Sequence, residues 1–178
     1  MGLPKALTRE AALVKLAQKY FCSHGPATVA DFSWWSGLSA REARQALEMV
    51  KSNLVSETVD SQTYWFPGNV SVSKPDGSHP FLIPAYDEYI ISYKDRSALF
   101  PYRYHHKLIS ENGIFRPTIL VDGQVRGMWK RTIKKDKAIL EIDLFESPDD
   151  TLLNLVEKAC EPFGRFLDKQ PEYHLIRQ

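Results

Sequence analysis

Hydrophobic positions recur at helical spacing in the first third of the chain. Over 8–23 they fall three or four residues apart, as on one face of a helix, and Thr8 is placed to cap that helix. His24-Gly25-Pro26 ends it, because glycine tolerates left-handed geometry and proline cannot continue a helix. Thr28 then starts a second, shorter helix that ends at Ser36-Gly37.

A third helix is predicted over 39–52, where Ser39 and Glu42 form a capping box. Its apolar residues gather on one side, and these are Ala43, Ala46, Leu47 and Val50. Its polar residues gather on the other side, and these are Arg41, Arg44, Gln45 and Glu48. Strand patterns follow at 54–59 and 62–66, joined by a two-residue turn. Three helices and a hairpin are the order of a winged helix, in which the third helix faces DNA and the hairpin is the wing.

The rest of the chain has the pattern of a sheet. Glycine, proline and serine concentrate in 68–80, which predicts a linker between a winged-helix domain at 1–67 and a second domain at 81–178. The second domain is predicted to be a mostly antiparallel β-barrel or sheet with one packed helix, so the fold class is α+β. Its expected elements are a short strand at 81–84, strands at 114–121, 124–133 and 138–145, a helix over 149–160 that Pro162 breaks or kinks, and a last strand at 174–177.

Composition narrows the class of protein without identifying it. No apolar run approaches the ~18 residues of a membrane span, and the first residues contain no secretory signal, so a cytoplasmic protein is expected. Cys22 and Cys160 match no metal spacing and are predicted to be buried free thiols. Neither a metal nor a cofactor is expected. All four tryptophans are assigned to the core, although the adjacent Trp34 and Trp35 cannot share one helix face.

Charge is segregated along the chain although the net charge is only +1. Residues 94–137 hold 11 Lys+Arg against 4 Asp+Glu, whereas 138–178 hold 4 against 9. The basic stretch is compatible with a footprint for a polyanion such as DNA. It is equally compatible with a basic hairpin that pairs with the acidic tail inside the fold.

Two groups of side chains are the candidate DNA contacts. On the third helix, Arg41 and Arg44 are suited to phosphates or a guanine edge, and Gln45 to adenine. In the basic stretch the candidates are Arg96, Arg126, Lys130, Arg131, Lys134 and Lys135. Arg126 and Lys130 are predicted to share one strand face. The alternative interpretations are a solvated helix face and an edge protected by lysines.

No catalytic constellation is present. The adjacent acids Asp87 and Glu88 point apart in either a strand or a helix, so a cap or salt bridge is expected of them rather than acid–base chemistry. His105 and His106 lack further metal ligands at a familiar spacing. No catalytic residue is therefore assigned.

Three blocks resemble the last winged helix and the following domain of bacterial tandem winged-helix proteins. They are 24–44, with His24-Gly25-Pro26-Ala27-Thr28 and Arg41-Glu42-Ala43-Arg44; 84–96, with Pro84-Ala85-Tyr86-Asp87-Glu88-Tyr89; and 112–131, with Asn112-Gly113-Ile114-Phe115-Arg116-Pro117-Thr118 and Trp129-Lys130-Arg131. Members with known chemistry are DNA glycosylases that remove alkylated bases and unhook crosslinks. The resemblance implies double-stranded DNA, intact or damaged, as the partner.

The departures from that family concern catalysis. Its members are about twice as long, and their catalytic pair of glutamines, separated by one apolar residue, lies in the N-terminal half. The glutamines here are Gln18, Gln45, Gln62, Gln124, Gln170 and Gln178, and no two are two residues apart. The chain is therefore interpreted as the DNA-binding part that corresponds to the C-terminal half of such proteins. It is either a fragment of a longer protein with further winged helices upstream or a short relative without the catalytic half, and no activity is expected of it alone. The alternative is a regulatory or protein-interaction module, in which the winged helix contacts protein or the barrel holds an effector.

Overall fold

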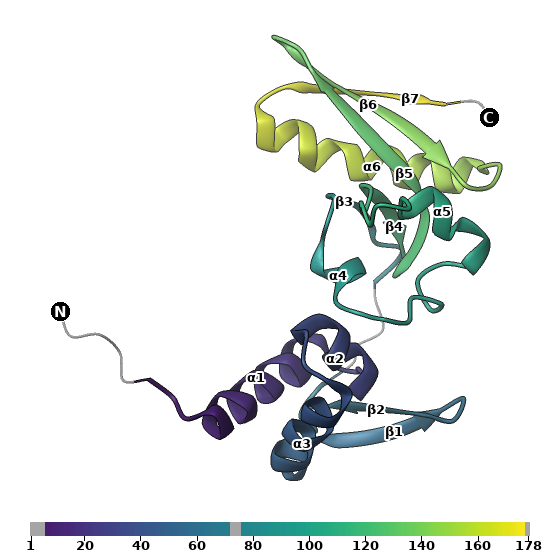
Figure 1. Ribbon diagram of the computed structural model, residues 1–178. Helices are drawn as coiled ribbons and strands as arrows, with labels where there is room; N and C mark the ends of the chain where they lie inside the picture. The colour runs from purple at the N-terminus through teal and green to yellow at the C-terminus, as the bar shows by residue number, and fades with distance from the viewer. Residues whose placement is uncertain (1–5, 72–75, 177–178) are drawn as a thin grey trace. The chain divides into compact units, whose positions relative to one another are not determined.

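The computed structural model describes residues 6–71 and 76–176, which form two compact units with a mixed α+β fold (Figure 1). The first unit consists of the described residues before Lys74 together with Ile91–Asp95. The second consists of the described parts of Lys74–Ile90 and Arg96–Gln178. Of the predicted linker at 68–80, residues 72–75 lie outside the described residues.

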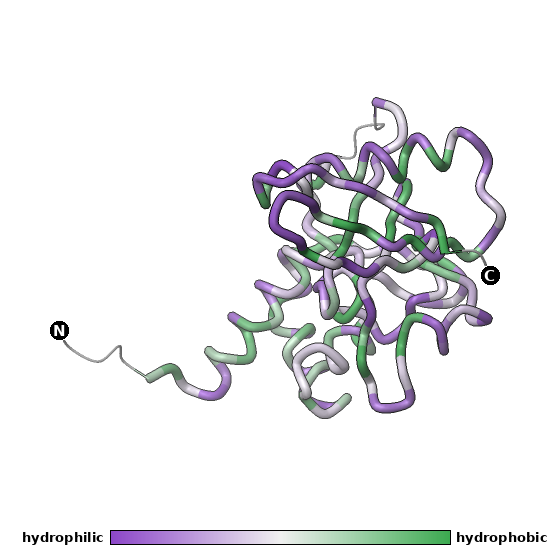
Figure 2. Tube along the Cα trace, turned by 90° about the horizontal axis from the view of Figure 1, so that it is seen from above, coloured by the Kyte–Doolittle hydropathy of each residue, from purple (hydrophilic) through white to green (hydrophobic). Residues whose placement is uncertain are grey.

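Three helices and a hairpin make up the first unit. In chain order they are α1 Arg9–His24, α2 Val29–Ser36, α3 Ala40–Val50, the short 3-10 helix η1 Lys51–Asn53, β1 Val55–Val59 and β2 Gln62–Phe66. These bounds agree with the predicted ones to within about two residues. Hydrophobic and hydrophilic stretches alternate along α1 in Figure 2, because one side of the helix is buried. That side contributes Leu13, Ala17, Tyr20 and Phe21 to a core shared with α2 and α3.

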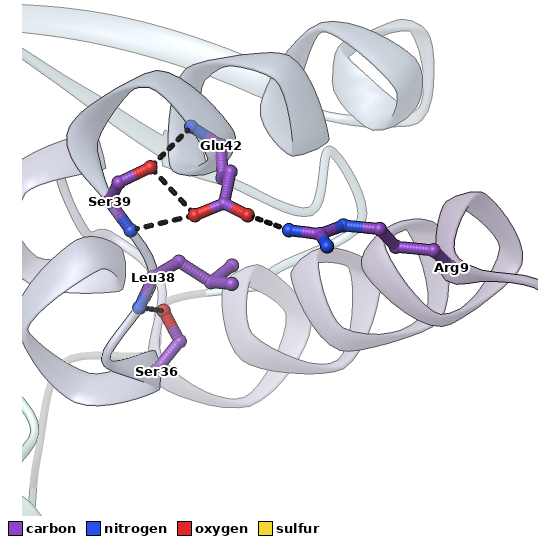
Figure 3. Close-up of polar contacts among 5 residues, drawn as sticks. All are labelled: Arg9, Ser36, Leu38, Ser39 and Glu42. Atoms are coloured by element: carbon purple, nitrogen blue, oxygen red, sulfur yellow. Dashed lines mark hydrogen bonds and ion pairs between the residues drawn. The ribbon is translucent and has the colours of Figure 1, made fainter.

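The helix starts are fixed by local hydrogen bonds. At the start of α3 the Ser39 hydroxyl accepts from Glu42 N at 3.3 Å, and the Glu42 carboxylate accepts from Ser39 N at 3.1 Å (Figure 3). The same carboxylate binds Arg9, so the start of α3 is tied to α1. These contacts, from the Ser39 hydroxyl first, lower the pKa of Glu42 below its ordinary value. The α2 helix ends at Gly37, whose φ of 71° favours glycine.

The hairpin β1–β2 is joined to the helices by its second strand. Its strands pair antiparallel around a two-residue turn in which Asp60 and Ser61 both have positive φ. That geometry matches the right-handed twist of the strands. Trp65 N donates to Ala27 O at 2.8 Å and Ala27 N donates to Trp65 O at 3.1 Å. The hairpin is therefore attached to the helical part near Ala27, and its turn is exposed to solvent.

A five-stranded sheet forms the frame of the second unit. Its strands are β3 Pro80–Ile83, β4 Thr118–Val121, β5 Gln124–Ile133, β6 Lys137–Leu144 and β7 Gln170–Leu175, in that spatial order. Neighbours from β3 to β6 are antiparallel, whereas β7 is parallel to β6 because α6 Asp150–Leu167 crosses between them. Short helices α4 Glu88–Ile91, η2 Tyr102–Tyr104 and α5 His105–Leu108 lie between β3 and β4 in the chain (Figure 1).

Three expectations for this unit need correction. The sheet is open rather than a barrel, since β3 and β7 are its edges among the described strands. Helix α6 passes through Pro162 to Leu167, because Phe163 packs against Trp129 with ring centroids 5.2 Å apart. The last strand is longer and earlier than 174–177, of which Arg177 lies outside the described residues.

Each face of the sheet is covered by a different segment. Helix α6 covers one face, over a cluster that contains Trp129, Leu140, Ile142, Val156 and Cys160. Residues from α4 to α5 cover part of the other, over a cluster that contains Ile90, Phe100, Leu108, Val125 and Met128. Burial raises the pKa of the Cys160 thiol to about 11, which makes it unreactive. Contrary to expectation, the second free thiol, Cys22 on α1, is exposed.

Candidate nucleic-acid interface

The polar face of α3 is exposed as its sequence pattern predicts. The four apolar residues of the helix are buried, and its polar residues Arg41, Arg44 and Gln45 are exposed. Glu48, which would repel phosphate on the same face, forms an ion pair with Lys51 at 2.5 Å. Arg41 and Arg44 therefore lie on a solvent-accessible surface, and Glu48, the carboxylate on that face, is paired with Lys51.

A groove of about 550 Å³ lies beside Arg44, between α2, the start of α3 and the hairpin turn. It is lined by Thr28, Val29, Ala30, Ser33, Trp34, Ala40, Arg44, Ser61, Gln62, Thr63, Trp65 and Lys94. The cations among these lining residues are Arg44 and Lys94. None of the lining residues that the structure describes carries a carboxylate. Hydroxyl and amide groups from the hairpin turn supply further hydrogen-bonding atoms. We call this the α2–α3 groove.

Lys94 belongs to this groove through a buried carboxylate. Asp31, only 3% exposed, accepts from Lys94 N at 2.8 Å and from Asp95 N at 3.3 Å. Its other oxygen accepts from Thr28 N and from the Thr28 hydroxyl, which closes the cap of α2. A segment more than 60 residues away in the chain is thereby fixed against α2.

Two tyrosines hold the same segment against α1. The Tyr93 hydroxyl donates to His24 O at 2.8 Å, and the Tyr20 hydroxyl donates to Ser92 O at 3.0 Å. Sequence reasoning missed Lys94 as a site residue. The only signal was its place in one of the shared blocks, because nothing local indicates that residues after β3 return to the first unit.

The two adjacent tryptophans of α2 have different environments. Trp35 is half-buried and packs on Tyr20, with ring centroids 5.0 Å apart. Trp34 is 51% exposed, and its indole Nε1 donates to Ile91 O at 2.9 Å. The core assignment is therefore wrong for Trp34, which lines the α2–α3 groove, because two adjacent residues of a helix cannot share one face.

The other candidates belong to the second unit and are dispersed within it. Arg96 is half-buried, donates from Nε to Ile90 O at 2.7 Å and lies over the Phe115 ring, a set of contacts typical of a structural arginine. Arg126 is exposed at a β-bulge, where Leu120 pairs with Val125 but Ile119 pairs with Gly127. The bulge breaks strand alternation.

The bulge also removes the predicted common face of Arg126 and Lys130. Arg126 lines a cavity of about 390 Å³ near the start of α6. Lys130 lines a different one of about 410 Å³. Alternation along β5 therefore predicts contacts correctly only on each side of the bulge.

The β5–β6 hairpin places its cations on opposite faces and close to carboxylates. Lys130 lies directly opposite Glu141, whereas the guanidinium of the next residue, Arg131, lies 5.9 Å from the Phe163 ring on the face that α6 covers. Lys137 forms an ion pair with Glu172 of β7 at 2.5 Å, which lowers the pKa of Glu172. The acidic C-terminal segment therefore offsets part of the basic stretch.

The turn of the same hairpin carries the last two candidates, Lys134 and Lys135, which are both exposed. Lys134 N donates to Lys137 O at 2.8 Å, which closes the turn. Lys135 is held through its carbonyl, which accepts from Lys169. Their side chains reach solvent without being brought to the cavity that Lys130 lines.

Local contacts account for two of the remaining chemical candidates. Asp87 accepts from Tyr89 N at 2.9 Å, a local cap, and His105 stacks on Tyr102. Among the described residues, no group of three or more His, Cys, Asp or Glu side chains is arranged to hold a metal ion. No helix in the described part of the chain is long and apolar enough to cross a bilayer.

Comparison with known proteins gives two matches. A family model described as "DNA glycosylase AlkZ-like" matches residues 2–166. The solved structure of Streptomyces sahachiroi DNA glycosylase AlkZ aligns with a TM-score of 0.80 and 17% sequence identity, over 97% of this chain and 47% of that one. At this identity the likeness shows the fold, and the chain spans about half the length of that protein. No curated protein sequence matches the chain.

Proposed function

Because the chain belongs to the AlkZ-like DNA glycosylase family, we propose that it binds double-stranded DNA, mainly through the phosphate backbone, and that its first unit acts as a winged helix. In this assignment α3 is the recognition helix and β1–β2 is the wing. The α2–α3 groove is the observation that supports the proposal. Arg44 and Lys94 line it, and none of its described lining residues has a carboxylate.

The contacts expected at this surface are mostly electrostatic. Arg44 and Lys94 each neutralise a phosphate, and Arg41 and Gln45 reach the duplex from the same exposed side of α3. Backbone contacts position a protein without reading sequence, so affinity depends strongly on salt and weakly on sequence. The hairpin turn, with Gln62 and Thr63, adds neutral hydrogen bonds.

We propose further that this chain by itself binds DNA without excising a base. Its glutamines nowhere form the spaced pair on which the catalysis of related glycosylases depends. The chain aligns with 47% of the solved glycosylase. Incubation with alkylated duplex is expected to release no base, measured by chromatography of the free bases.

The binding itself is tested by titrating the chain with a labelled paired duplex at about 50 and 200 mM salt. Between these concentrations, a protein that makes even a few phosphate contacts loses a measurable part of its affinity. The double variant Arg44→Ala/Lys94→Ala is expected to lose about tenfold in affinity and to reduce the salt slope by about two units. Its control is Lys15→Ala/Lys19→Ala, the same charge change on the exposed side of α1. Absence of binding at the lower salt contradicts the proposal.

A protein contact is the second candidate for the second unit alone. The sheet face beside β7 sets Lys130 opposite Glu141, and Lys137 beside Glu172. Balanced charge of this kind suits another protein better than a polyanion. A partner retained by the whole chain in the absence of DNA, and lost with Glu141→Lys, supports this role.

A further inference from the structure

The α2–α3 groove contains a feature that phosphate binding does not require. Trp34 is 51% exposed, although tryptophan has a large apolar surface to bury. Its Nε1 donates to Ile91 O at 2.9 Å, which restricts the orientation of the indole. The ring is therefore held beside the groove in a set position with half of its surface accessible to solvent.

The groove combines this ring with groups that recognise phosphate. Arg44 comes from α3 and Lys94 from the segment that Asp31 fixes, so the two cations approach from different elements. A volume of about 550 Å³ is within the range of sites for small ligands, ~300–1,000 Å³. Aromatic platforms with cations beside them are how proteins hold single-stranded nucleic acid, because every base has a face that can stack.

From this arrangement we propose that the α2–α3 groove receives an unpaired nucleotide of DNA. Its base stacks on the indole of Trp34, and its phosphate lies between Arg44 and Lys94. In a continuous duplex the bases stack on one another and their faces are closed to the protein, so only a displaced or unpaired base can use Trp34. The inference rests on the proposed function and adds the preferred DNA structure to it.

The test compares three labelled DNAs of one length at low salt: a paired duplex, the same duplex with one unpaired nucleotide, and a single strand. The wild-type chain is expected to bind the DNA with an unpaired nucleotide about tenfold more tightly than the paired duplex, within the range known for stacking one base on an aromatic ring. Trp34→Ala is expected to bring this ratio close to one. Trp34→Phe keeps most of it, because phenylalanine retains an aromatic face.

Two further measurements separate stacking from a folding defect. Tryptophan emission is expected to be quenched by the unpaired nucleotide in the wild-type chain and to be quenched less in Trp34→Phe, which keeps an aromatic face but leaves Trp65 as the only tryptophan among the described lining residues of the groove. Tyr102→Ala is the matched control, since Tyr102 is an 85% exposed aromatic of the second unit and its loss should leave the ratio unchanged.

The outcomes distinguish this inference from the proposed function. Salt-dependent binding of the paired duplex with equal affinity for the unpaired nucleotide overturns the inference and leaves the proposed function standing. A preference that persists in a folded Trp34→Ala variant overturns it as well. Failure to bind any of the three DNAs at low salt overturns both.

Discussion

Two regions of the molecule carry clusters of cations, and their surroundings differ. In the α2–α3 groove, buried hydrogen bonds from Asp31 hold Lys94 against α2, so that it lines the groove together with Arg44, and no described lining residue is a carboxylate. On the β5–β6 hairpin, Lys130 faces Glu141 and Lys137 pairs with Glu172. The hairpin contributes more cations to the sequence, but the groove leaves its cations better placed for a polyanion.

The difference shows that charge density along a chain is a poor guide to electrostatic potential. Residues 94–137 contain an excess of seven positive charges, yet strands β6 and β7 bring carboxylates beside two of them, Lys130 and Lys137. Residues 1–67 are nearly neutral, yet folding places one arginine of α3 beside a lysine from beyond this range. Which charges are compensated depends on strand register and on long-range contacts.

The largest expected effect comes from removing the carboxylate that assembles the groove. Asp31→Ala deletes the acceptor of four hydrogen bonds from Thr28, Lys94 and Asp95. Because charged hydrogen bonds in buried sites are strong, we expect the free energy of unfolding to fall by about 3 kcal/mol. We also expect the affinity for paired duplex to fall with it, since Lys94 loses its anchor. Urea unfolding and duplex titration measure the two effects.

The corresponding change in the second unit is expected to cost much less. Glu172→Ala removes only an exposed ion pair with Lys137, and exposed ion pairs contribute little to stability. Equal losses of stability in the Asp31 and Glu172 variants would show that the buried network does not distinguish the two regions. Glu10→Ala, on the exposed start of α1, controls for the change in net charge alone.

A smaller effect is expected from making the hairpin resemble the groove. Glu141→Gln removes the carboxylate opposite Lys130 while keeping the shape of the side chain. Uncompensated, Lys130 is then available to phosphate, and we expect affinity for duplex to rise by about threefold at low salt with a steeper salt slope. An unchanged affinity would mean that this face of the sheet does not approach DNA, which would favour a protein contact there.

Removing hairpin cations is expected to have a still smaller effect. Arg126→Ala/Lys130→Ala should weaken binding by about twofold and about equally on all sequences, because the contacts expected are to phosphates. The loss is less than for the groove variant, since the two side chains line different cavities and Lys130 already faces a carboxylate. A loss as large as that of Arg44→Ala/Lys94→Ala would reverse the ranking of the two regions.

Local signals predicted the first unit well. The capping boxes at Thr28 and Ser39 and the turn before β2 act within a few residues, so the sequence contains the information needed to place them. The amphipathic pattern of α3 likewise placed Arg41, Arg44 and Gln45 on its exposed face.

Features that depend on distant partners were missed. The hydrogen bond between Asp31 and Lys94 N joins residues that are 63 positions apart in the chain. The identity of the two residues does not predict that contact. The bulge at Arg126 depends on how β5 meets β4, and Pro162 remains inside α6 because Phe163 packs on a strand. Hydrophobic periodicity predicts elements, whereas such contacts are decided by which elements meet.

The smallest expected effect is on thermal stability and concerns one carboxylate in each region. Both have a lowered pKa, but for different reasons. The pKa of Glu42, at the start of α3, is lowered first by the hydroxyl and amide of Ser39, which are neutral groups. The pKa of Glu172 is lowered first by the charged Lys137. A carboxylate with a lowered pKa stabilises the fold above its ordinary value of 4.5, and this contribution disappears as the pH falls through the lowered pKa.

Glu42→Gln and Glu172→Gln should therefore each lower the melting temperature near neutral pH, and the difference from wild type should shrink as the medium becomes acidic. Salt distinguishes them, because it screens an exposed ion pair and leaves a neutral capping box largely intact. Melting curves at pH 7 and pH 3, each at low and about 1 M salt, should show a Glu42 effect that persists in salt and a Glu172 effect that is lost. If salt abolishes both, the scaffold beneath the groove depends on Arg9 rather than on the cap, and the contrast between a hydrogen-bonded region and an ion-paired one fails.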